Sequence, residues 1–218
     1  TRKESSAASD VYKRQDYTYG YSHALADGVV RPVVFLAYSG EAQWKDSAGE
    51  EYSARLGEPL NAEQTTRAWR TALDPKGDWI AAVLSAAHTR LMKIRANMPD
   101  AGGLVIATNK TTARAYAKIL ESLSNTPVTV VLSDEPGASD RIDEFSASRD
   151  EWMVAVRMVS EGVDVPRLSV GVYATSASTP LFFAQAIGRF VRSRMPGESA
   201  SVLLPSVPVL LRLAEEME

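Results

Sequence analysis

Residues 102–123, GGLVIATNKTTARAYAKILESL, place a short apolar run directly before an amphipathic segment. The run at 102–107 is typical of a buried strand, and the helix after it is expected to begin at Thr111 or Thr112 and to end at Leu123. The same alternation continues: further strands are expected at 127–133, 152–156, 169–174 and 200–205, with helices at 139–147, between the fourth and fifth strands, and at 207–217. Continuous apolar strands that alternate with helices are typical of a parallel sheet covered by helices on both faces. The sequence therefore predicts an α/β fold.

The N-terminal part of the chain has a less regular order of elements. The run VVRPVVFLAY at 29–38 is rich in β-branched residues and bounded by turn residues, which indicates a buried strand. The charged, turn-rich stretch 41–60 is interpreted as a loop or a hairpin arm. Two helices are expected here, at 62–73 with Asn61 as cap and at 78–98 with Asp78 as cap. Residues 1–16 are polar and without period, so we interpret them as a disordered or foreign leader.

Composition excludes several classes of function. The chain has 218 residues with 24 Lys and Arg against 27 Asp and Glu, so its net charge is −3 and a fold-wide basic field for nucleic acid is absent. It contains no cysteine and only two histidines, far apart, which excludes disulfides and thiolate sites and predicts no metal site. No run approaches the roughly 18–20 apolar residues of a membrane span, and no signal peptide is recognisable. We therefore expect a cytoplasmic protein without a membrane partner.

The stretch QAIGRFVRSR, 185–194, concentrates arginines beside apolar residues. On a helix, Phe183, Ile187 and Phe190 would form an apolar stripe, and a second face would hold Gln185, Gly188, Arg189 and Arg192. Two forked cations next to a glycine suit phosphate oxygens, which arginine binds in bidentate fashion. The alternative interpretation is a solvated arginine face on an ordinary amphipathic helix.

Two loops also contain side chains that could bind a ligand. We expect these loops and the arginine helix to lie at the carboxyl ends of the parallel strands, where α/β sheets bind ligands. In SEGVDVPRL, 160–168, Asp164 could accept hydrogen bonds from ribose hydroxyls. In TNKTTA, 108–113, hydroxyls, an amide and helix N-terminal NH groups could bind a phosphate. Each loop has an ordinary alternative, a turn for the first and a helix cap for the second.

Together and in order, these segments match a known family. The sequence QAIGRFVR, 185–192, fits the pattern Q-x-x-G-R-x-x-R of superfamily 2 helicases. MVSEGVDVPRL, 158–168, resembles the preceding motif of that superfamily, and GLVIATNKTTARAYAKIL, 103–120, resembles the one before it. The similarity spans roughly residues 100–205 and is to the second, C-terminal RecA-like lobe of a DEAD/DEAH-box-type ATP-dependent helicase. It implies a RecA-like sheet of the P-loop NTPase type at 100–218 and an inter-lobe segment, with one strand and two helices, at 17–99.

The resemblance also implies roles for individual residues. Arg189 and Arg192 would be arginine fingers that reach the γ-phosphate of ATP bound by a first lobe, an effect worth about 10³–10⁵ in rate in known GTPases. The residues implied to contact ATP or to couple the lobes are Gln185, Gly188, Glu161, Gly162 and Asp164. The residues implied to contact the nucleic-acid backbone are Thr108, Asn109, Ser176 and Thr179. Such contacts position a strand without reading its sequence, and few of them need a cation. DNA is favoured over RNA as the partner.

The sequence departs from the family in one large respect. It contains neither G-x-x-x-x-G-K-[ST] nor D-E-x-H/D, so the phosphate cradle and the carboxylate that binds Mg²⁺ are missing. We therefore expect this chain to be a fragment that does not hydrolyse ATP alone, with ATP and Mg²⁺ held mainly by an N-terminal RecA-like lobe that precedes Tyr17. Two alternatives remain: a non-catalytic α/β interaction module with a degenerate helicase-lobe fold, and a doubly wound nucleotide- or sugar-binding domain. The latter predicts a glycine-rich first βα turn, which the sequence lacks.

Overall fold

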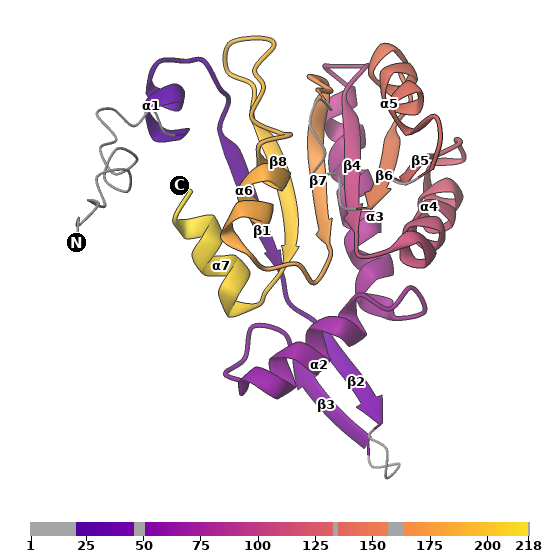
Figure 1. The fold of residues 1–218 in the computed structure, drawn as a ribbon, viewed down its shortest axis with the longest axis vertical. Coiled ribbons are helices and arrows are strands. Elements are labelled where there is room, and N and C mark those ends of the chain that lie inside the picture. Colours follow the sequence, from indigo (N-terminus) through magenta and orange to yellow (C-terminus); the bar gives the residue numbers. More distant parts are fainter. Residues whose placement is uncertain (1–20, 46–50, 133–134, 157–163, 218) are drawn as a thin grey trace, which may run out of the picture.

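A computed structural model of the chain describes residues 21–45, 51–132, 135–156 and 164–217 (Figure 1). The helices in these residues are α1 (Tyr21–Ala26), α2 (Ala62–Ala72), α3 (Asp78–Arg95), α4 (Lys110–Ser124), α5 (Ala138–Ala147), α6 (Pro180–Ile187) and α7 (Pro208–Glu215). The strands are β1 (Val33–Tyr38), β2 (Glu41–Lys45), β3 (Glu51–Arg55), β4 (Gly102–Ala107), β5 (Thr129–Leu132), β6 (Trp152–Val156), β7 (Leu168–Ala174) and β8 (Ala200–Pro205). The strands and helices expected from residue 102 onward are thereby confirmed, with bounds shifted by a few residues. The leader at 1–16 lies outside the described residues.

Six of these strands form one parallel sheet in the order β1-β8-β7-β4-β6-β5. All five neighbouring pairs are parallel, which confirms the predicted α/β fold. Every residue of β4, β6, β7 and β8 is buried, as the continuous apolar runs predict. β1 comes from the segment 17–99 and pairs along its length with β8 at one edge of the sheet.

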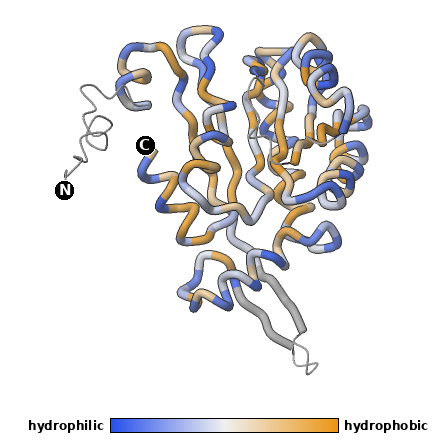
Figure 2. The backbone as a smooth tube through the Cα atoms, viewed as in Figure 1, coloured by the Kyte–Doolittle hydropathy of each residue, from blue (hydrophilic) through white to orange (hydrophobic). Residues whose placement is uncertain are grey.

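Helices cover both faces of the sheet, as predicted. α3 and α4 pack against each other and against β7, β4 and β6 on one face. α6 and α7 lie over β1 and β8 on the other face, where Phe35 of β1 stacks on Phe183 of α6 with ring centroids 5.9 Å apart (Figure 1). Figure 2 shows hydrophobic residues along the strands and hydrophilic ones on the outer turns of α4 and α5.

A close approach between β4 and β6 fixes the centre of the core. Trp152 is fully buried, and a Cβ atom on Gly103 of the neighbouring strand would overlap its ring. The indole Nε1 of Trp152 donates a hydrogen bond to Nδ1 of His88 in α3 at 3.3 Å. Gly103 therefore provides the room that the tryptophan ring occupies, and the ring links the sheet to α3.

The stretch 41–60 is a hairpin arm, one of the two structures expected for it. β2 and β3 pair antiparallel and contact α2. Figure 1 shows this unit projecting beyond the carboxyl ends of the parallel strands, and the base of the hairpin is closed where Leu56 N donates to Gly40 O at 2.9 Å. Asn61 caps α2 as predicted, with its side chain accepting from Gln64 N. Asp78 is not the cap of α3: Gly77 holds the extended cap position, and Asp78 is the first helical residue.

Candidate functional site

Asp164 and Arg192, two of the residues predicted to act on ATP, lie at the amino end of the parallel sheet. Asp164 lies four residues before β7 begins at Leu168. Arg192 forms an isolated antiparallel bridge with Val30, which precedes the start of β1. The Nη2 atom of Arg192 lies 3.0 Å from Oδ2 of Asp164, and the two side chains are 62% and 46% exposed. The structure thus brings together an arginine and an aspartate that are 28 positions apart in the sequence.

This location corrects the expectation that all three segments lie at the carboxyl ends of the strands. A parallel connection returns the chain to the amino end of the sheet before the next strand starts. Asp164 belongs to the end of such a connection, between β6 and β7, and Arg192 belongs to the one between β7 and β8. Glu161 and Gly162, the other predicted members of this loop, lie outside the described residues.

The arginine stretch is only partly helical, which corrects a second expectation. α6 ends at Ile187, and Gly188 is its C-cap, with its N–H donating to Ala184 O at 2.8 Å. Arg192 therefore does not share a helical face with Gln185; it lies in an extended segment paired with Val30. Glycine has a poor helix propensity, and the extended pairing supplies an alternative partner for the backbone.

The apolar stripe of this stretch is confirmed, since Phe183, Ile187 and Phe190 are all buried. Gln185 and Gly188 are exposed on the other side of α6, beside Leu181, which is 70% exposed. Arg189 is partly buried: burial lowers the pKa of its guanidinium, and the nearby Asp164 carboxylate offsets part of that shift. Arg189 stays cationic at neutral pH because the arginine pKa is so high.

The predicted nucleic-acid-contacting residues lie at the opposite, carboxyl end of the sheet. Thr108 follows β4, and the exposed Ser176 follows β7. Asn109 caps α4, with Oδ1 accepting from Thr112 N at 3.0 Å. Thr179 caps α6, with Oγ1 accepting from Phe182 N at 3.3 Å. Capping uses acceptor oxygens, whereas phosphate oxygens need donors, so the amide NH₂ of Asn109 and the hydroxyl proton of Thr179 are the relevant groups.

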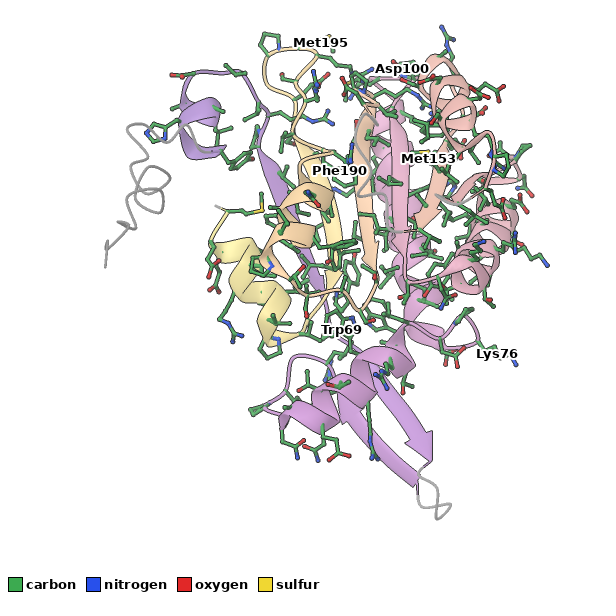
Figure 3. The ribbon with its side chains drawn as sticks, in the orientation of Figure 1. Trp69, Lys76, Asp100, Met153, Phe190 and Met195 are labelled. Carbon is green, nitrogen blue, oxygen red and sulfur yellow. The ribbon has the colours of Figure 1, made fainter. Side chains whose placement is uncertain are left out.

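The two groups of residues therefore occupy two different ends of one sheet. Figure 3 labels Asp100 and Met195 at the amino end and Trp69 at the carboxyl end. Hydrogen-bond donors of two kinds are thus separated: guanidinium groups lie at the amino end, and hydroxyl and amide groups lie at the carboxyl end.

Two charged residues at the amino end of the sheet were not identified as candidates from the sequence alone. Arg31 and Glu198 are buried and form an ion pair, with Nη1 of Arg31 3.1 Å from Oε2 of Glu198. A charged residue inside the otherwise apolar run VVRPVVFLAY was the available signal for Arg31. Glu198 has no comparable signal, because it lies in a polar loop whose composition is typical of exposed residues.

Comparisons with known proteins found uncharacterized relatives of greater length. A scan of protein families found no match. The chain is 71% identical over 212 residues to the uncharacterized protein Rv2917 of Mycobacterium tuberculosis, and 65% identical over 208 residues to the uncharacterized protein ML1624 of Mycobacterium leprae. These matches cover 97% and 95% of this chain but 35% of each relative, so the chain spans about a third of their length.

Among solved structures, the chain resembles a fragment of a putative HsdR subunit of a type I restriction enzyme from Vibrio vulnificus. The TM-score is 0.61 at 16% identity, over 91% of this chain and 36% of that one. The fold is RecA-like, as in helicase lobes. Domain 2 of the DEAD-box helicase Mss116p, bound to an RNA duplex, matches 64% of this chain and 55% of that one with a TM-score of 0.49 at 16% identity, too low to support a conclusion.

Neither a metal cluster nor a membrane helix is found in the described part of this RecA-like lobe. No group of three or more histidine or acidic side chains there has the arrangement of a metal site. No helix in those residues is both long enough and apolar enough to cross a bilayer.

Proposed function

We propose that this chain is the C-terminal motor lobe of an ATP-dependent nucleic-acid helicase or translocase. The observation that carries the proposal is the cluster of Arg189, Arg192 and Asp164 at the amino end of a RecA-like sheet. In the proposed complex, an N-terminal RecA-like lobe holds ATP and Mg²⁺, and this lobe supplies the arginines. The two guanidinium groups stabilise the negative charge that develops on the γ-phosphate during hydrolysis.

The pairing of Arg192 with Asp164 suits such a role. Ion pairs between exposed side chains contribute about 0–1 kcal/mol, since water screens both partners. Both of these side chains are largely exposed. Exchanging Asp164 for a phosphate oxygen therefore costs Arg192 little, and Asp164 is then available to ribose hydroxyls.

The motor cycle follows from the location of the two groups of residues. ATP binding closes the two lobes over the nucleotide, and hydrolysis reopens them. Thr108, Asn109, Ser176 and Thr179, at the carboxyl end of the sheet, hold the sugar-phosphate backbone of the strand. Because the helices of the lobe connect the two ends, closure at one end moves the strand contacts at the other.

The test is ATP hydrolysis by the full-length protein. We expect the full-length protein to hydrolyse ATP faster when single- or double-stranded DNA is added, and this chain alone to hydrolyse none. A full-length protein that binds no nucleotide would contradict the proposal and favour a non-catalytic interaction module. RNA of the same sequences serves as the comparison ligand, and a larger stimulation by RNA would correct our preference for DNA.

The carboxyl-end contacts make a separate prediction. In the full-length protein, the double variant Thr108→Val and Ser176→Ala should weaken binding of unrelated DNA sequences by a similar factor. Each lost hydrogen bond is worth about 0.5–1.5 kcal/mol, or about 2- to 10-fold in affinity. Fluorescence anisotropy with three labelled DNAs measures the effect. Ser122→Ala, an exposed serine in the last turn of α4, is the matched control and should leave affinity unchanged. A loss confined to one sequence would argue against backbone contacts.

A further inference from the structure

Arg31 is a buried cation that binds three distant segments of the chain. Its side chain is 1% exposed. Its Nε donates to the carbonyl oxygen of Phe190 at 2.8 Å, its Nη1 donates to Glu198, and its Nη2 donates to the carbonyl oxygen of Leu168. The backbone N–H of Arg31 also donates to Val191 O at 2.8 Å. One residue thus binds two consecutive carbonyl oxygens between the proposed arginine fingers.

The ring of Phe190 is fixed as well as its carbonyl group. Phe190 is fully buried, and a Cβ atom on Gly171 of β7 would lie 2.5 Å from its ring. The bare backbone of Gly171 therefore provides the surface on which the ring rests. Arg189 directly precedes this anchored residue, and Arg192 follows it by two positions. Both arginines project from a short segment whose centre is held by β7 and by Arg31.

Arg31 is also connected to the segment that carries Asp164, through its hydrogen bond to Leu168. Leu168 begins β7, and Asp164 lies four positions before it. Glu198 completes the arrangement: it pairs with Arg31, and its Oε2 accepts from the backbone N–H of Arg194 at 3.2 Å. The guanidinium of Arg31 therefore donates directly to the segment that carries Arg189 and Arg192. It is connected to Asp164 through Leu168, to which it also donates.

Resting on the proposed function, we propose that Arg31 is a positioning residue for the arginine fingers. It does not touch the nucleotide; it sets the backbone from which Arg189 and Arg192 project. A planar guanidinium has five donors in a fixed fork, so it reaches three acceptors in different directions. Lysine retains the charge opposite Glu198 but has no such fork. A displacement of about 1 Å in a catalytic group can cost about 10²-fold in rate.

The experiment compares Arg31→Lys with Arg141→Lys in the full-length protein. Arg141 lies in α5, which packs on β5 at the opposite edge of the sheet. It is the matched control because its Nη2 also donates to a backbone carbonyl, that of Pro136 at 3.2 Å, and also lies near a glutamate, 3.7 Å from Oε2 of Glu135. We expect Arg31→Lys to lower kcat for ATP about 10- to 100-fold with KM changed less than about 3-fold, because the fingers act on the transition state. Arg141→Lys should leave kcat within about 3-fold of wild type.

Hydrogen exchange supplies a readout that is independent of activity. Amides of residues 188–194 should exchange faster in Arg31→Lys than in wild type, and Arg141→Lys should leave them unchanged. If exchange at 188–194 and kcat are both unchanged in Arg31→Lys, the proposal is overturned. If both arginine variants lower kcat equally, Arg31 acts only through general stability, which also overturns it.

A second substitution separates this proposal from the proposed function. If Arg192→Ala leaves turnover unchanged, the finger assignment fails and the positioning role fails with it. If Arg192→Ala lowers turnover and Arg31→Lys does not, only the positioning role fails. Adding Arg31→Lys to Arg192→Ala should lower kcat by less than it does in wild type, since both act on the same step. Fully additive losses would show that Arg31 acts elsewhere.

Discussion

Replacing Arg192 with alanine in the full-length protein is expected to lower kcat for ATP by about 10³-fold, the lower end of the range for arginine fingers in GTPases. ATP binding should change little, because Arg192 acts on charge that develops during phosphoryl transfer rather than on the bound ground state. The side chain of Arg192 forms an exposed ion pair with Asp164, and its bridge to Val30 uses the backbone, so the substitution should leave the fold intact. Steady-state hydrolysis with saturating DNA measures kcat, and a fluorescent ATP analogue measures the Kd.

Arg212→Ala is the matched control for this prediction. Arg212 is an exposed arginine in the last turn of α7, and it should tolerate alanine without loss of kcat. A kcat of Arg192→Ala within about 3-fold of wild type would exclude Arg192 as a finger. A large rise in the Kd for ATP with unchanged kcat would instead show that Arg192 binds the ground state.

The second large effect is on the stability of the fold and comes from Trp152, a residue of the core. Trp152→Ala should lower the free energy of unfolding by about 3–5 kcal/mol, as for other large aromatic residues in closely packed cores. The side chain is fully buried between β4 and α3, so its removal leaves a cavity and removes the hydrogen bond to His88 Nδ1. Urea unfolding of the purified chain, followed by circular dichroism, measures the difference.

A double-mutant cycle tests the packing that causes this effect. Gly103→Ala alone should cost about 1–3 kcal/mol, because the added methyl group overlaps the Trp152 ring. In the Trp152→Ala background the ring is absent, so Gly103→Ala should be close to neutral. Equal costs in both backgrounds would show that the two residues do not contact each other in solution.

The sheet could be predicted from the sequence because its strands are continuous apolar runs separated by amphipathic helices. The run that contains Leu104, Val105 and Ile106 is buried on both faces, and a parallel sheet is the arrangement that requires this. The pairing of β1 with β8 could not be predicted in the same way, because paired residues are 167 positions apart, as in Val33 and Ala200, and no local pattern specifies the partner. Helix α1, only six residues long, was not predicted either.

The arrangement of the candidate site differs from the one that the sequence predicts, and the roles of its residues stay predictions. Periodicity placed Arg192 on a helical face with Gln185, whereas the helix ends at Ile187. That end depends on contacts of Val30 and Arg31 with residues 190–192, which are remote in sequence. The predicted ATP-contacting and nucleic-acid-contacting residues lie at different ends of the sheet because each parallel connection returns the chain to the amino end. The positions of the motifs in the sequence do not by themselves indicate this. The roles of Thr108, Asn109, Ser176 and Thr179 stay predictions.

The central claim, that the arginine segment meets the γ-phosphate of ATP, is tested most directly by photocrosslinking. The full-length protein, with Mg²⁺ and DNA, is irradiated with an ATP analogue whose γ-phosphate carries an aryl azide, and the adducts are mapped by mass spectrometry. We predict adducts within residues 185–194, which excess ATP removes and which this chain alone does not form. Adducts that fall only outside 185–194, although ATP still competes for the site, would contradict the account.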